Sequence, residues 1–190
     1  MKKVCLLVVA MFGVLTMQAQ QVELKEIKEL TFFGVDFSIA QVFGATETAD
    51  QFEQAFEGIN GLFLSEPKKY SPSQAFPKVN ITESYRMVNS LNLERVYETL
   101  KRDDNEYELT DEMIAEQVAS YDTGDYTEGY GAILIAGLMN KPQNMATYHK
   151  VIFDLSTKEV ISNKRITTKA GGFGLRNYWA GSVAKALKSK

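Results

Sequence analysis

Hydrophobic and polar positions in the last third of the chain predict three consecutive strands. The first is a nearly continuous apolar run, typical of a strand buried on both faces of a sheet. The second alternates, with Val151 and Phe153 facing one way and Lys150 the other. Short polar connections separate the runs, so the three strands should form an antiparallel meander. The expected ranges are 131–139, 146–155 and 159–168.

An alternating pattern near the beginning of the chain predicts another strand, which is long. It covers 30–43, and because of its length we expect it either to continue past the sheet or to bend at Gly34. A period of two places four apolar residues on one face: Phe33, Val35, Phe37 and Ile39. A short edge strand is expected within 79–87.

Four segments have apolar residues at helical spacing. The first follows Thr48 or Asp50 as N-cap and continues to Phe63. The second is capped by Asn89 or Asn92 and reaches about Arg102. Its expected buried residues are Leu93, Val96, Tyr97 and Leu100. A third follows Thr110, and the last runs from Leu175 to the C-terminus.

These patterns together predict one domain of the α/β (α+β) class over 20–190. The sheet should be mixed, with four or five strands that include the C-terminal meander. Amphipathic helices must bury their apolar faces against a sheet, and we expect them mainly on one side.

Residues 1–19 have the pattern of a cleaved signal peptide. Lys2 and Lys3 precede an apolar run that is too short to span a bilayer, and Ala19 follows it. Cys5, the only cysteine, comes before the apolar run, so it does not mark a lipid-anchoring site. The expected product is periplasmic or secreted, has no lipid anchor or transmembrane span, and contains no disulfide or cysteine metal site.

Charge is unevenly distributed after the signal segment. Residues 20–140 contain nine basic and 22 acidic residues, whereas 141–190 contain ten basic and two acidic ones. An overall acidic chain is a poor candidate for binding nucleic acid. The basic third could attract an anionic partner of the cell envelope, or the two halves could neutralise each other within one fold.

A glycine-rich turn between the last strand and the last helix is the main candidate ligand site. Gly172 and Gly174 resemble the start of a dinucleotide fingerprint, but the third glycine is missing. Main-chain N–H groups at the start of the helix could bind a small anion. The residues of this candidate site are Lys169, Gly172, Gly174, Arg176 and Asn177. Alternatively, the turn is only a connection.

The other candidate chemistry is weaker. Asp122-Thr-Gly124 is the tripeptide of aspartic proteases, but here it follows a helical pattern, so the end of a helix is the alternative. His149 is the only histidine and alternates with core residues, which favours a structural, hydrogen-bonded side chain. Asp36 has no identifiable carboxylate partner and is expected to accept hydrogen bonds from a neighbouring loop. We therefore expect no catalytic residue, no metal site and no cofactor.

The order of the C-terminal elements resembles a known periplasmic α/β domain. A strand ends in Asp154-x-x-Thr157-x-x-Val160 and is followed by a return strand, a glycine-rich turn and a helix. This arrangement is similar to domains of the curli secretion lipoprotein, of lipoprotein activators of peptidoglycan synthases, and of the Tol-Pal translocation protein. The early segment Val35-Asp-Phe37 is similar to their opening strand. Lys158 stands where that family usually has glycine, and its lipid-anchoring cysteine is absent.

The expected function is that of a non-enzymatic interaction module in the periplasm or outside the cell. The resemblance implies the fold and no active-site residues. An envelope protein or a cell-wall component is the expected kind of partner. Binding of a small anion at 171–177 is the alternative, and a hydrolase is the third possibility.

Overall fold

The computed structural model describes residues 24–189, and the predicted signal peptide lies outside this range. The described part contains seven strands, four α-helices and two short 3-10 helices. The strands are β1 (Glu29–Asp36), β2 (Gln41–Phe43), β3 (Asn80–Glu83), β4 (Lys101–Arg102), β5 (Tyr130–Asn140), β6 (Met145–Asp154) and β7 (Val160–Lys169). The α-helices are α1 (Ala49–Ser65), α2 (Arg86–Glu94), α3 (Asp111–Ala119) and α4 (Leu175–Lys188). None of these helices is long and apolar enough to cross a membrane.

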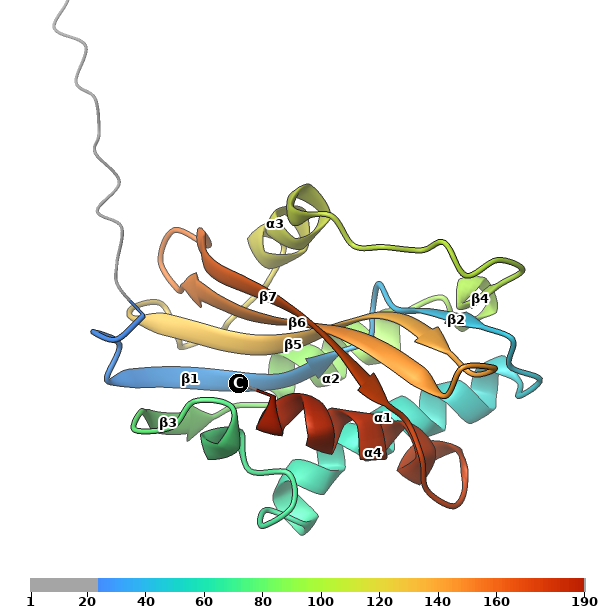
Figure 1. Cartoon of the computed structure of the whole chain (residues 1–190). Coiled ribbons are helices and arrows are strands. Elements are labelled where there is room, and N and C mark those ends of the chain that lie inside the picture. Colours follow the sequence, from blue (N-terminus) through green and yellow to red (C-terminus); the bar gives the residue numbers. More distant parts are fainter. Residues whose placement is uncertain (1–23, 190) are drawn as a thin grey trace, which may run out of the picture.

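The seven strands form one curled, mixed sheet whose centre is β5 (Figure 1). On one side, β6 and then β7 pair antiparallel, which confirms the predicted meander. On the other side, β1 and β2 lie end to end, and both run parallel to β5. Farther out, β3 pairs with β1 and β4 pairs with β2, again in parallel. The sheet is therefore five strands wide. Two of these five positions each contain two strands: β1 with β2, and β3 with β4.

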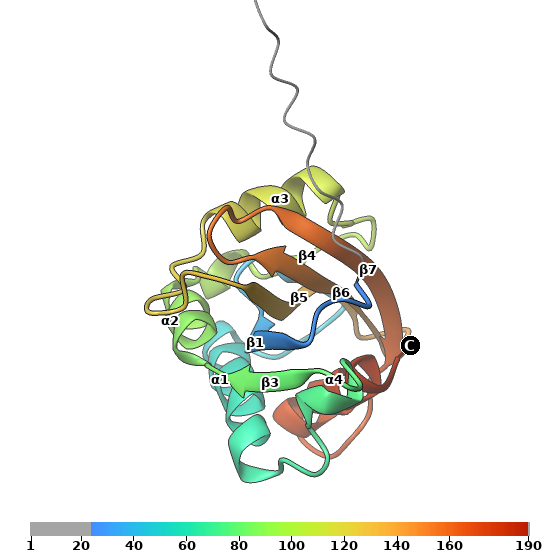
Figure 2. The same cartoon turned by 90° about the vertical axis from the view of Figure 1, so that its left-hand side faces the viewer.

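Helices cover both faces of the sheet, but three of the four lie on one side (Figures 1 and 2). Helices α1 and α4 pack together there, α2 packs beside α1, and α3 lies over the opposite face. Neighbouring aromatic residues of β1 belong to different layers. Phe32 packs on Phe63 of α1, with ring centroids 5.4 Å apart, whereas Phe33 packs on Phe153 of β6 at 6.0 Å. The α/β class with helices mainly on one face is confirmed.

The strand predicted over 30–43 is irregular at Gly34, as its length suggested, but it is also divided into two strands, β1 and β2. Residues 37–40 leave the ladder between β1 and β2, and the register with β5 shifts between Phe32 and Val35. Gly34 lies within this shift at φ +100°, a conformation that glycine adopts readily. As a result, Phe37 stacks on Phe56 of α1 at 4.1 Å and does not share the layer of Phe33.

Side-chain amides take the place of a neighbouring strand where β1 has none. The Oδ1 of Asn60 accepts the Val35 N–H at 2.9 Å, and its Nδ2 donates to the Val35 carbonyl at 2.9 Å. Asn92 accepts the Phe37 N–H at 2.8 Å and donates to the same Val35 carbonyl at 3.1 Å. Both amides are buried. Buried main-chain groups need hydrogen-bond partners. These two side chains supply them at the end of β1, where helices and not another strand lie on the side away from β5.

The predicted helix from Asn89 or Asn92 to Arg102 was wrong. Helix α2 begins at Arg86 and ends at Glu94, so Asn92 lies inside it and is not its cap. Arg95 leaves the helix, and its guanidinium group donates to three carbonyl groups of the segment between β1 and β2: Phe37, Ser38 and Ala40. Two residues expected in the core are exposed: Leu93, in the last turn of α2, and Val96, which follows the helix. Tyr97 and Leu100 are buried, as predicted.

The N-terminal caps of two helices confirm the sequence prediction. Thr48 accepts the Gln51 N–H, and the Gln51 side chain accepts the Thr48 N–H at 2.9 Å, which completes a capping box for α1. Thr110 accepts the Met113 N–H at the start of α3. Such caps satisfy N–H groups that lack partners within the helix.

Candidate functional site

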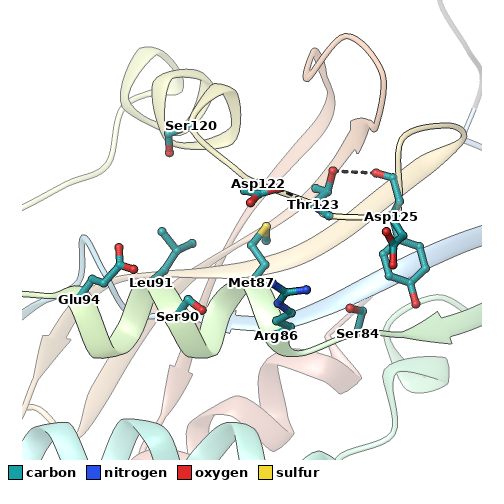
Figure 3. Close-up of a pocket in the computed structure, with 12 residues that line it drawn as sticks. Ser84, Arg86, Met87, Ser90, Leu91, Glu94, Ser120, Asp122, Thr123 and Asp125 are labelled. Carbon is teal, nitrogen blue, oxygen red and sulfur yellow. Dashed lines mark hydrogen bonds between the residues drawn. The ribbon is translucent and has the colours of Figure 1, made fainter.

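A groove of about 500 Å³ lies between α2 and the segment that follows α3 (Figure 3). Arg86 and Glu94 approach it from α2, and Asp122 and Asp125 face them from the other wall. Met87 and Leu91 add apolar surface, and three serines add hydroxyl groups: Ser84, Ser90 and Ser120. The lining is therefore mixed, with more acidic than basic groups.

Hydrogen bonds in this groove hold the turn together and do not form a catalytic pair. Asp122 Oδ1 accepts the Gly124 N–H at 3.0 Å. Thr123 Oγ1 donates to the Tyr126 carbonyl at 2.7 Å and accepts a hydrogen bond from Lys158 Nζ at 2.6 Å. The Asp122-Thr-Gly124 sequence thus forms a turn after α3, as the alternative interpretation predicted. Within residues 24–189, no group of three or more His, Cys, Asp and Glu residues could hold a metal ion.

Asp36 is completely buried at the end of β1, and its carboxylate is well satisfied. It accepts the Ser38 N–H at 2.7 Å, the Gln117 amide at 2.9 Å and the Tyr121 hydroxyl at 2.7 Å. Burial, together with the charge of Asp36, raises the pKa of Tyr121 well above its ordinary value, so the phenol remains a donor. None of these partners is a carboxylate. The predicted role as a buried hydrogen-bond acceptor is confirmed, and the same contacts attach α3 to the sheet.

His149 is buried under α3, and its Nδ1 is hydrogen-bonded to Asn163 Oδ1 at 2.9 Å. Asn163 in turn donates to Asp111 at 2.7 Å. This chain of contacts connects β6, β7 and the first turn of α3. The prediction of a hydrogen-bonded structural histidine is confirmed.

The glycine turn brings together only part of the predicted anion site. Gly172 and Gly174 line a small hollow of about 190 Å³ at the start of α4, together with Tyr178 and an ion pair between Glu47 and Lys141. A carboxylate from the chain itself therefore lies at this helix N-terminus. Burial raises the pKa of Glu47, but hydrogen bonds from Lys141 and the main chain outweigh this effect and leave the pKa below its ordinary value.

The other predicted residues of the anion site are directed elsewhere. The Arg176 side chain packs against Gly58 of α1, and its Nε donates to Asn177 Oδ1 at 3.2 Å. The Lys169 carbonyl accepts a hydrogen bond from Lys185 Nζ at 2.7 Å. Neither Lys169 nor Arg176 is among the residues that line the hollow. Anion binding at this turn stays a prediction.

Phe173 is the feature of this turn that sequence reasoning missed. Its side chain is 96% exposed, more than any other large apolar side chain of the described residues. The loop that carries it is firmly attached: the Gly171 N–H donates to the Tyr178 carbonyl at 2.9 Å. A Cβ atom on Gly172 would lie 2.5 Å from the Asn177 carbonyl oxygen, so only glycine fits this close approach. The available signal was an aromatic residue between glycines, outside the helical stripe of α4.

Comparisons with protein families, with curated proteins and with solved structures find no match to this chain.

Proposed function

We propose that this protein is a non-enzymatic interaction module, exported to the periplasm or the medium, which binds a partner through the loop 171–174. The observation that carries the proposal is the exposed Phe173 ring on an anchored glycine loop. The partner would be an envelope protein or a cell-wall component with an apolar pocket for the ring.

Energetics support an aromatic anchor at this position. A fully exposed phenyl ring contributes little to folding, whereas its burial in a partner removes a large apolar area from water. A loop that is already held in place loses less conformational freedom on binding than a flexible one. A few aromatic side chains often provide most of the binding free energy of an interface.

A photo-crosslinking amino acid at position 173 tests this proposal in cells that naturally produce the protein. We expect a discrete crosslinked product from position 173 and none from position 64, because Leu64 is also exposed, at 70%, but lies on α1. Once the partner is known, Phe173→Ala should weaken binding at least about tenfold. The same substitution should change the free energy of unfolding by less than about 0.5 kcal/mol. Equal crosslinking from both positions would contradict the proposal.

Binding of a small anion at the turn is the alternative function, and a thermal shift experiment separates it from the first. We expect phosphate and sulfate to raise the melting temperature of the wild type and of Arg176→Ala equally, because Glu47 already lies at the helix N-terminus. A specific site would instead stabilise the wild type alone, by about 2.7 kcal/mol at a concentration one hundred times the dissociation constant. That result would favour the ligand-binding function.

A further inference from the structure

Strand β7 forms an edge of the sheet. Helix α3 lies above its first half in Figure 2, where Asp111 accepts a hydrogen bond from Asn163. Among residues 24–189 it pairs only with β6. Main-chain groups of an edge strand alternate, so every second residue directs its N–H and C=O away from the sheet. These groups can pair with another extended chain.

The register identifies which residues face outward. The Ala170 N–H donates to the Asn144 carbonyl at 2.7 Å, next to β6, so Thr168 and Ile166 also direct their main-chain groups inward. By alternation, the outward main-chain groups belong to Asn163, Arg165, Thr167 and Lys169. The Lys169 carbonyl is already bonded to Lys185 Nζ. The other three residues have no main-chain partner on this side within the described part of the chain.

Charge determines what kind of chain could pair there. Lys164, Arg165 and Lys169 are all exposed, and the C-terminal third of the chain is strongly basic. A second copy of β7 would place like charges opposite each other, which destabilises a strand pair. An acidic chain would instead gain charge-assisted contacts.

One contact within the molecule already has this chemistry. Glu108, in the segment before α3, approaches Arg165 Nε at 3.3 Å, and both side chains are more than half exposed. Such surface pairs are weak and exchange readily. A carboxylate of an incoming chain could therefore replace Glu108.

We propose that the β7 edge binds an extended acidic peptide segment as an additional strand, with main-chain hydrogen bonds to Asn163, Arg165 and Thr167. The main-chain ladder would provide affinity, and the basic side chains would select acidic sequences. This surface is distinct from Phe173, so either proposal can fail without the other.

A synthetic probe tests the proposal directly. It is a short blocked peptide in which glutamate alternates with valine, titrated by fluorescence anisotropy into the protein comprising residues 20–190. Two matched probes accompany it: one has lysine in place of glutamate, and the other is N-methylated at alternate residues, which removes main-chain donors and keeps the charge. We expect the acidic probe alone to bind.

Protein variants and amide hydrogen exchange locate the binding. Arg165→Glu should weaken binding at least about tenfold, equivalent to 1.4 kcal/mol. Lys68→Glu, on an exposed loop away from β7, and Phe173→Ala should leave it unchanged. The acidic probe should protect the amides of Asn163, Arg165 and Thr167. Absence of binding, equal binding of the N-methylated probe, or protection elsewhere would overturn the proposal and show that the basic residues only guard the edge.

Discussion

His149 links the protein's stability to pH. Burial lowers its pKa below the ordinary 6.5, although the hydrogen bond with Asn163 acts in the opposite direction. Among the nearby charges, Arg165 lowers the pKa further, whereas Asp111 and Glu108 raise it. The unfolded chain therefore takes up a proton at a higher pH than the folded protein. The folded state is fully favoured above the unfolded pKa and loses stability as the pH falls toward the folded one.

We expect His149→Gln to have a flatter stability profile than the wild type between about pH 7.5 and 5.5, where only histidine titrates at its ordinary pKa. Denaturant midpoints at several pH values measure the difference. Carboxylates titrate in both proteins and largely cancel in the comparison. Parallel profiles would show that His149 takes up a proton equally well in the folded and unfolded states.

At the scale of elements, the amides that replace a strand beside β1 can be tested one at a time. Asn92→Leu replaces the amide on α2 with an apolar side chain of similar size and leaves the buried Phe37 N–H without a partner. The expected loss in the free energy of unfolding is about 1–3 kcal/mol. Asn89→Leu is the matched control, because Asn89 lies on the same helix but is exposed, and it should change stability by less than about 0.5 kcal/mol. Urea denaturation measures the free energy of unfolding of both variants. Similar losses for Asn92→Leu and Asn89→Leu would show that the side-chain amide of Asn92 is unimportant.

Elements were predictable where their causes lie close together in the sequence. The caps Thr48 and Thr110 stand a few residues from the groups they bond, and the apolar run of β5 reports burial directly. The break after β1 depends on partners at a distance: Asn60 is 25 residues from Val35, and Arg95 is 58 residues from Phe37. No local pattern contains that information.

The candidate site was predictable in part for the same reason. The glycines of 171–174 identify a turn before a helix, and the structure places one there. What surrounds the turn depends on Glu47 and Lys141, which come from distant segments. Likewise, Phe173 is exposed because no other described element covers it, whereas the aromatic stripe of α1 is buried because the sheet covers it. Whether another element covers Phe173 is not contained in the local sequence.

At the scale of the whole molecule, the buried residues of both layers form one continuous cluster. We therefore expect a single cooperative unfolding transition. Trp179, the only tryptophan, is buried on α4 and reports on one layer by fluorescence, while far-UV circular dichroism reports on all elements. Their denaturant midpoints should coincide. Two separated midpoints would divide the described chain into independent units.

The placement of β1 beside β5 has a consequence for the order of folding. Thr31 lies opposite Gly131, so this parallel pair closes a loop of about one hundred residues, whereas β5 and β6 are joined by a short turn. Closing a long loop is entropically costly and slows the formation of such contacts. The first strand to be synthesised should therefore be among the last to find its place. In pulsed hydrogen exchange during refolding, we expect β5 and β6 amides to gain protection before those of β1.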